Sequence, residues 1–180
     1  MKLIATLLTF TFLIPTILTS PTPKSRRSLP DYLAIITSLT EATNDFSSRI
    51  TEYAADSITG SDLLTHSTDL FDAYASLSGT VIQLAPLSSS DIPGLANAIL
   101  VLRDATGDMV DNLISVEGDL AGDGLNDEFL VWLGQVKGEM EYLRDRIVDK
   151  VPNGALKDIA YDVLDSIPEE VRRGEDAFST

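Results

Sequence analysis

The chain contains no cysteine and a single histidine. Without thiols it can form no disulfide and offers no thiolate as nucleophile or metal ligand. The one imidazole, His66, lacks the second histidine or cysteine that a zinc site needs, so it is interpreted as a surface or boundary residue. No Gly-x-Ser-x-Gly elbow and no Gly-rich phosphate loop ending in Lys-Ser/Thr occurs. We therefore predict a protein that is not an enzyme, with no catalytic residue, no cofactor and no metal site.

Basic residues are also scarce. Lys and Arg number 13 against 28 Asp and Glu, and removal of residues 1–27 would leave nine against 28, a formal charge of −19. Such a charge repels phosphate backbones, so nucleic acid is excluded as a partner. One acidic cluster offers oxygen ligands to calcium, but its spacing is not that of an EF-hand, and we interpret it as a solvated turn with helix-capping acids. Its members are Asp119, Asp123, Asn126, Asp127 and Glu128.

A long apolar run occurs at the N-terminus. Lys2 precedes the run Leu3–Leu18, which Pro15 interrupts. The run is too short for a membrane span and is typical of a secretory signal, so residues 1–20 are predicted to be a signal peptide. We expect a secreted protein, extracellular or associated with a cell wall, with no transmembrane segment in the mature chain.

The predicted signal is followed by a short segment rich in proline and basic residues, 21–30, which is assigned as a pro-segment or linker. It contains the dibasic pair Arg26-Arg27. A processing protease could cut after Arg27, or the segment could serve as a flexible basic spacer. The remaining residues, 31–178, are predicted to form one domain with enough apolar material for a core.

The segment 124–151 carries the clearest pattern in the chain, apolar residues at steps of three and four. This spacing predicts an amphipathic helix that Pro152 ends. On its polar face Lys137, Glu141 and Arg144 lie at spacings where neighbouring charges along one helix meet. The apolar positions are Leu125, Phe129, Trp132, Val136, Met140, Leu143, Ile147 and Val151. One helix cannot bury such a stripe alone, so partner helices are required.

Four further segments show the same period: 31–53, 63–84, 95–116 and 156–178. Pro168 interrupts the last, and Ser166 with Glu169 resembles a capping box, so a kink or a restart is expected there. The glycine-rich segment 118–124 is predicted to be a turn. Because no strand-like alternation occurs, we predict an all-α fold, an antiparallel up-and-down bundle of about five amphipathic helices.

Aromatic and methionine side chains fall near the middle of these predicted helices. They are ordinary core material, yet flexible methionines among aromatics also suit an adaptable pocket for an apolar ligand. A polar head group on such a ligand could be met by Tyr53, Tyr74, Arg103 or a helix N-terminus. The predicted lining consists of Phe46, Phe71, Tyr74, Leu102, Met109, Trp132, Val136 and Met140.

Several stretches are similar to the fungal hydrophobic surface-binding protein A family. Near the start these are Ile36-Thr-Ser-Leu39 with Thr43, Phe46 and Ile50, and near the end Asp149-Lys-Val-Pro152, Ile159-Ala160, Ile167 and Gly174-Glu-Asp-Ala-Phe178. The resemblance covers about residues 31–178. It implies a small secreted or wall-associated protein that adsorbs to hydrophobic surfaces and can recruit a secreted hydrolase. Related cell-wall galactomannoproteins enclose fatty acids or similar lipids between their helices, which implies a lipid partner here.

Two hypotheses follow. The first is a secreted, noncatalytic binder of lipids or hydrophobic surfaces, in which apolar stripes enclose a fatty-acid-like ligand or open onto an apolar surface. The second is a secreted cell-wall or effector-type interaction protein with a solid helical core, whose acidic surface meets a cationic partner.

Overall fold

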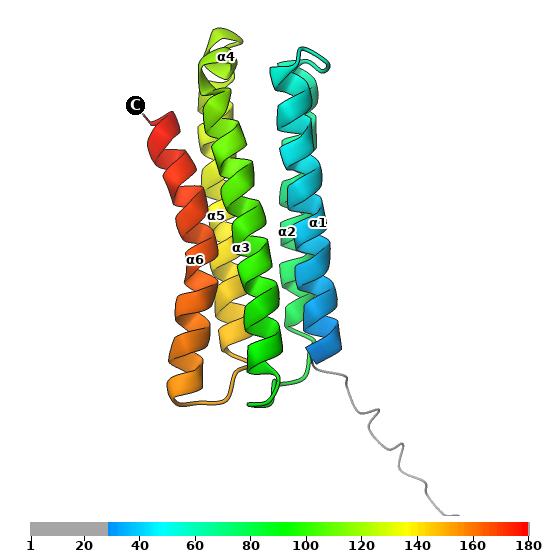
Figure 1. Cartoon of the computed structure of the whole chain (residues 1–180), viewed down its shortest axis with the longest axis vertical. Coiled ribbons are helices and arrows are strands. Elements are labelled where there is room, and N and C mark those ends of the chain that lie inside the picture. The colour runs from blue at the N-terminus through cyan, green and yellow to red at the C-terminus, as the bar shows by residue number, and fades with distance from the viewer. Residues whose placement is uncertain (1–28, 180) are drawn as a thin grey trace, which may run out of the picture.

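The computed structural model describes residues 29–179, which form six α-helices and no strand. Residues 1–28, with the predicted signal peptide and most of the predicted linker, lie outside the described residues. Figure 1 shows the long helices side by side, with consecutive helices joined alternately at the two ends. The helices are α1 (Leu29–Ala54), α2 (Gly60–Val81), α3 (Ile92–Ser115), α4 (Glu117–Gly122), α5 (Asn126–Val148) and α6 (Ala155–Phe178).

The long helices are arranged as a closed ring. Their closest backbone contacts join α1 to α2, α2 to α5, α5 to α6, α6 to α3 and α3 back to α1. Helices that face each other across this ring approach less closely within residues 29–179. Because packed helix axes lie about 8 to 10 Å apart, the centre of a five-membered ring is about 7 to 8.5 Å from each axis. Large side chains are therefore needed to fill it.

The core runs along the whole axis of the ring. Every long helix contributes a buried apolar stripe, and each fully buried large side chain stabilises the fold by roughly 1.5 to 3 kcal/mol. The largest side chains that are almost completely buried are Tyr32, Tyr74, Phe46, Phe129, Ile36, Leu39, Ile50, Leu63, Leu95, Ile99, Leu102 and Met109. Within residues 29–179 no helix combines the length and apolarity needed to span a membrane.

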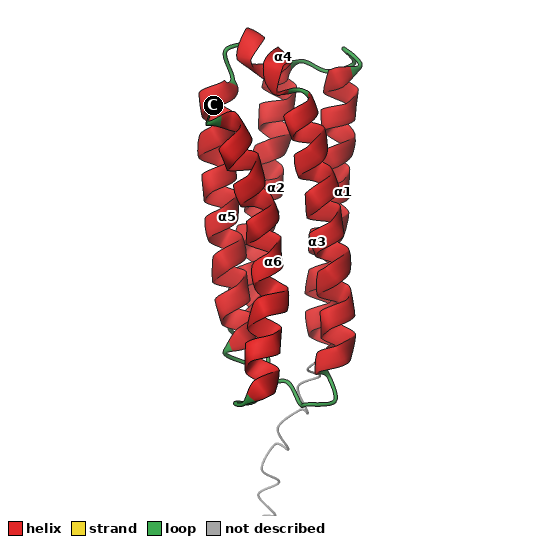
Figure 2. Ribbon diagram, turned by 60° about the vertical axis from the view of Figure 1, so that its left-hand side comes forward, coloured by secondary structure: helices red, strands yellow, loops and turns green. Residues whose placement is uncertain are grey.

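Helix α4 lies where the glycine-rich segment predicts a turn. The apolar stripes predict about five helices, whereas the described residues contain six, because Glu117–Gly122 makes one and a half turns between α3 and α5. Leu120 anchors this short helix, since its side chain is completely buried while its neighbours are exposed. Figure 2 shows α4 at one end of the bundle. A single buried residue leaves no periodic pattern, so the helix has no sequence signature.

Helix α6 does not restart at Pro168. It runs from Ala155 to Phe178 with Pro168 buried inside it. The expected capping box does not form either, because the Ser166 hydroxyl donates to the carbonyl of Val163 at 2.6 Å. Because Pro168 is buried, the fold tolerates the loss of the one backbone hydrogen bond that a proline cannot donate, and the helix continues past it.

The charged face of α5 also differs from the expectation. Lys137 pairs with Glu175 and Arg144 with Asp165, both on α6. Arg144 also pairs with Asp145 beside it. The predicted pairing of both cations with Glu141 was wrong, because α6 packs against this face and brings its carboxylates to it. The spacing of charges along one helix could not reveal the partner on another.

The ends of the helices are fixed by local hydrogen bonds. Thr59 and Asp62 form a capping box at the start of α2, with the Asp62 amide donating to Thr59 Oγ1 at 3.2 Å and the Thr59 amide donating to Asp62 at 3.0 Å. At the opposite end Lys150 Nζ donates to the carbonyls of Ile82 at 2.9 Å and Leu84 at 3.0 Å. The Leu87 amide donates to the Lys150 carbonyl at 2.8 Å. Lys150 thereby joins the α2–α3 link to the end of α5.

Candidate functional site in the ring interior

An aromatic layer crosses the ring. The rings of Phe46, on α1, and Trp132, on α5, lie 5.0 Å apart between centroids, and Phe129 meets Trp132 edge-on at 5.9 Å. Helices α1 and α5 are not neighbours in the ring, so the contact between Phe46 and Trp132 spans its centre. Tilted and edge-on pairs of this kind add about 0.5 to 1.5 kcal/mol beyond the area they bury.

Trp132 is fixed by one hydrogen bond as well as by packing. Its indole Nε1–H donates to the backbone carbonyl of Ser67, on α2, at 2.7 Å. Ser67 is only 1% exposed and its small side chain lies on the buried face of α2. A buried indole N–H without an acceptor is costly, so this bond fixes the orientation of the ring.

A second layer consists of hydroxyl groups. We call Thr43, Tyr74 and Thr106 the hydroxyl cluster; they come from α1, α2 and α3, and all three are completely buried. Tyr74 Oη lies 3.1 Å from Thr43 Oγ1 and is also in hydrogen-bonding contact with Thr106. Helices α2 and α3 face each other across the ring, so the cluster also spans its centre. Burial raises the pKa of Tyr74 to about 12, because its surroundings disfavour a negative charge.

The residues predicted to line a ligand pocket are brought together in this interior. Seven of the eight are at most 4% exposed, and Phe71 is half-buried at the edge of the same core. The seven are Phe46, Tyr74, Leu102, Met109, Trp132, Val136 and Met140. That they contact a ligand stays a prediction.

The groups considered for a polar head have separate positions. Tyr74 lies at the centre of the ring, whereas Tyr53 lies near one end and donates to Asp123 at 2.9 Å. Arg103 is on the surface and pairs with Asp104 beside it. Of these three, Tyr74 is the one completely buried at the centre of the ring, whereas Tyr53 is buried at its end and Arg103 is outside it.

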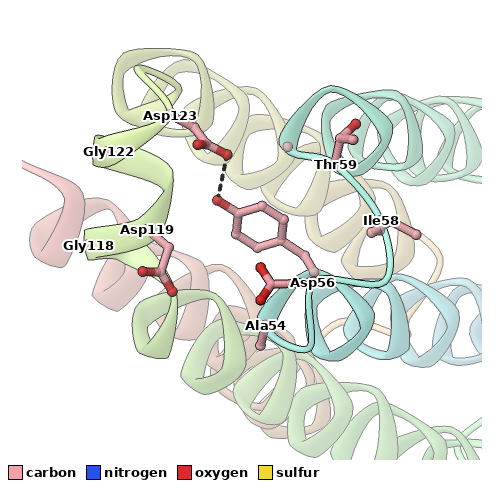
Figure 3. Close-up of a pocket in the computed structure, with 10 residues that line it drawn as sticks. Ala54, Asp56, Ile58, Thr59, Gly118, Asp119, Gly122 and Asp123 are labelled. Carbon is pink, nitrogen blue, oxygen red and sulfur yellow. Dashed lines mark hydrogen bonds between the residues drawn. The ribbon is translucent and has the colours of Figure 1, made fainter.

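A hollow of ≈ 780 Å³ opens at the α4 end of the bundle. Figure 3 shows Asp119 and Asp123 of the α4 region facing it from one side, with Asp56 and Thr59 from the α1–α2 link on the other. Burial and then the hydrogen bond to Asp123 raise the pKa of Tyr53 to about 12. The hollow is open, polar and acidic, so it does not suit a lipid tail. Within residues 29–179 no three His, Cys, Asp or Glu side chains are arranged to hold a metal ion.

A smaller hollow of ≈ 90 Å³ lies at the seam between α1 and α2. Its rim includes His66, with Asp69 at 3.7 Å from the imidazole. Phe46 and Leu70, which are 2% and 3% exposed, also line it. Phe46 belongs to the aromatic layer, so its side chain joins this seam to the centre of the ring.

Sequence reasoning singled out Tyr74 as a polar group but missed the two threonines beside it in the interior. Thr43 and Thr106 occupy positions in the apolar stripes of 31–53 and 95–116, where every third or fourth residue is buried. The sequence does place one threonine in the apolar stripe of each of these two helices. These threonines point to a polar cluster only once the fold brings Tyr74 between them.

The interior thus combines an apolar aromatic layer with a small uncharged polar cluster, which suits a long apolar molecule with one polar group. No protein-family model and no curated protein sequence matches this chain. Solved structures do match it. Ligand-binding domain 2 of the Penicillium marneffei MP1 protein, complexed with multiple arachidonic acids, is 25% identical with a TM-score of 0.77, over 87% of this chain and 99% of that chain.

Two further structures have the same fold. Ligand-binding domain 1 of the same protein, complexed with arachidonic acids, is 20% identical with a TM-score of 0.76 over 86% of this chain and 100% of that one. AfMP4p in complex with palmitic acid is 14% identical with a TM-score of 0.75 over 84% and 99%. The described chain therefore shares its helical fold with fungal proteins that are solved with fatty acids bound.

Proposed function

We propose that this protein is a noncatalytic binder of fatty-acid-like lipids, held between the helices of the ring. The observation that carries the proposal is that the aromatic layer and the hydroxyl cluster both cross the centre of a fold shared with fatty-acid complexes. A ligand lying along the ring axis would meet apolar side chains along its tail. Each methylene transferred from water contributes about 0.8 kcal/mol.

The proposal requires the ring to expand, because side chains fill its centre. Met109 and Met140, both almost completely buried, supply flexible thioethers that can change rotamer at low cost. Phe46 at the α1–α2 seam is the side chain whose rotation would join the outside to the centre. Binding would then replace contacts between side chains by contacts with the ligand, so affinity would depend on chain length.

Fluorescence of Trp132, the only tryptophan, offers a direct test. Titration of residues 28–180, delipidated, with palmitic acid should change the emission of Trp132 and saturate at one or a few ligands. Leu102→Phe, which adds bulk to the filled interior, should weaken binding about tenfold, since overpacking costs about 1 to 3 kcal/mol. Val101→Phe is the matched control, because Val101 is 58% exposed. Lack of any saturable change with palmitic acid would contradict the proposal.

A second function is favoured by the filled core itself. The central side chains of the described residues are buried against one another, as in a solid bundle. A secreted cell-wall or effector-type interaction protein would use such a bundle as a scaffold for its acidic surface. Mass spectrometry of lipids extracted from the natively secreted protein separates the two functions, since a solid bundle would carry no stoichiometric lipid.

We also propose that the protein is secreted and associated with the extracellular space or a cell wall, as residues 1–20 predict. Adsorption to hydrophobic surfaces, as in the hydrophobic surface-binding protein A family, and recruitment of a secreted hydrolase remain proposals supported by the sequence resemblance alone. Retention of the purified protein on a wax-coated surface, with and without prior loading with palmitic acid, tests adsorption. If the same apolar side chains bind the lipid and the wax, prior loading with palmitic acid should reduce retention of the protein on the wax.

A further inference from the structure

The hydroxyl cluster has committed all its hydrogens. Thr43 Oγ1 donates its only hydrogen to the carbonyl of Leu39 at 2.8 Å, and Thr106 Oγ1 donates to Leu102 at 2.9 Å. Tyr74 Oη lies 3.1 Å from Thr43 Oγ1, where either hydroxyl can be the donor, and it also contacts Thr106, so the three hydroxyl hydrogens serve four contacts and none is left over. Each of the three oxygens still has capacity to accept a hydrogen bond. The centre of the ring is thus rich in acceptors and has no free donor.

The cluster also lacks a charged partner. Within residues 29–179 no hydrogen bond or ion pair joins any of its three side chains to a Lys or Arg. Most cations of the described chain lie at the surface and pair with carboxylates, as Arg173 does with Asp111. Burial that raises the pKa of Tyr74 acts in the same sense on any acid placed beside it. A carboxylate at the cluster would find neither a cation nor a spare hydrogen.

We propose that the hydroxyl cluster selects lipids whose polar group donates a hydrogen bond, namely fatty alcohols and other lipids with a free hydroxyl. The inference rests on the proposed function, since it assigns the polar end of the same ligand. A ligand hydroxyl would donate to Tyr74 Oη, Thr43 Oγ1 or Thr106 Oγ1 without breaking an existing bond. A carboxylate can only accept, so the threonines would have to give up the bonds to their own helices.

Fatty acids are compatible with the cluster in one protonation state. A neutral carboxyl group carries one hydrogen and can donate it as an alcohol does. The ionised form must lose its hydration without compensation, which is costly in a buried site. The cluster therefore distinguishes ligands by whether the head group can donate a hydrogen bond, and not by the size of the head group.

Three ligands with twelve-carbon chains distinguish the effect of a hydrogen-bond donor in the head group from the effect of its charge. Dodecanol donates, methyl dodecanoate only accepts and is neutral, and dodecanoate at pH 8 is ionised, given that an ordinary carboxyl titrates near pH 4 to 5. Dissociation constants come from Trp132 emission at concentrations below micelle formation. We expect dodecanol to bind about two- to tenfold more tightly than methyl dodecanoate, the range for one hydrogen bond, and dodecanoate to bind most weakly.

Isosteric variants assign the effect to the cluster. Thr106→Val and Tyr74→Phe should bring the ratio of the dodecanol and methyl dodecanoate affinities towards one. Thr40→Val is the matched control for threonine loss, because the Thr40 hydroxyl donates to Ile36 at 2.8 Å in the same way but lies outside the cluster. The ratio is insensitive to the folded fraction, since partial unfolding weakens both ligands equally.

The outcomes separate the inference from the proposed function. Binding of dodecanoate as tight as that of dodecanol, or a ratio of dodecanol to methyl dodecanoate affinity that neither Thr106→Val nor Tyr74→Phe changes, would overturn the inference while leaving lipid binding intact. If none of the three ligands changes Trp132 emission, the proposed function fails and the inference fails with it. A ratio above about two in the parent protein and in Thr40→Val that is lost in at least one of the two cluster variants supports the inference.

Discussion

Helices α2 and α6 are held in the same ring by different forces. Outside the ring, α6 is held by ion pairs: Lys137 and Arg144 of α5 reach Glu175 and Asp165. On the other side Arg173 of α6 reaches Asp111 of α3. Helix α2 contains no Lys or Arg at all. Its polar contacts face inward instead, where Trp132 donates to Ser67, Tyr74 bonds Thr43, and Ser78 donates to Glu139 at 3.2 Å.

The surface ion pairs of α6 and the buried hydrogen bonds of α2 differ in what they contribute. Surface ion pairs contribute little in water and are weakened by salt, so those of α6 mainly fix its position. Buried hydrogen bonds are expensive to leave unmade, so those of α2 hold its buried side chains in fixed positions. If the proposed function is correct, α2 is the helix on which the polar group of a ligand would meet atoms that the fold already uses.

The largest expected effect is at Trp132. Trp132→Ala removes the aromatic contact across the ring and the bond that holds α2, so it should lower the free energy of unfolding by about 3 to 5 kcal/mol. Urea denaturation followed by circular dichroism measures it. Val131→Ala is the matched control, because Val131 is 62% exposed and its loss should change stability by less than about 0.5 kcal/mol. A loss below about 1 kcal/mol at Trp132 would mean that the ring does not depend on its centre.

Alkaline pH should act next most strongly, and on the α2 side. Burial raises the pKa of Tyr74 to about 12 from the ordinary value near 10. The neutral form is thus favoured in the folded protein, so this stabilisation is complete below pH 10 and is lost as the pH rises to about 12. Two pKa units correspond to roughly 2 to 3 kcal/mol. Urea midpoints measured from pH 8 to 12 should fall less in Tyr74→Phe than in the parent.

Buried Tyr32 and Tyr53 sharpen this prediction, because burial raises the pKa of each to about 12 as well. Tyr32 donates to the carbonyl of Ala85, just after α2, at 3.0 Å. Tyr74→Phe should therefore retain part of the alkaline transition. A transition of equal size in both proteins would show that Tyr74 is ionised freely and is not sealed in the ring.

At neutral pH, Tyr74→Phe should have a moderate effect. Both threonines keep the bonds to their own helices, so the variant loses the contacts of the Tyr74 hydroxyl with Thr43 and Thr106, and each neutral hydrogen bond is worth about 0.5 to 1.5 kcal/mol. Urea denaturation at pH 7 measures the loss. A loss above about 3 kcal/mol would indicate that the threonines depend on Tyr74 for their own bonds.

The smallest effect is expected on α6. Glu175→Gln breaks the pair with Lys137, whose side chain is 28% exposed, and should cost less than about 1 kcal/mol at low salt. Raising the salt concentration to 1 M should reduce that cost, whereas the cost of Tyr74→Phe should not respond. If both variants respond to salt alike, the contrast between the two helices is lost.

The helical stripes were readable because burial on one face leaves a period in the sequence. The segment 124–151 predicted α5 to within three residues at each end, and the buried state of Trp132 and Met140 followed from it. Contacts between helices leave no such period. The partners of Lys137 and Arg144 lie 38 and 21 residues away, so nothing near either residue pointed to them.

The candidate site was likewise predictable only where it depends on burial along single helices. The aromatic and methionine residues were predicted by their place on the stripes, and the structure does bring them together in the ring interior. The hydroxyl cluster was not predicted, since Thr43 and Thr106 are ordinary residues until Tyr74 comes between them. The short helix α4 was not predicted either, because Leu120 is its only buried residue and leaves no periodic pattern.

Lys150 joins two helices at one end of the ring. Its side chain binds the carbonyls of Ile82 and Leu84, beyond the end of α2, from its own position just after α5. This end of the bundle is therefore closed by hydrogen bonds between links as well as by packing, and Lys150→Met would remove the two side-chain bonds while the backbone bond from the Leu87 amide to the Lys150 carbonyl stays in place.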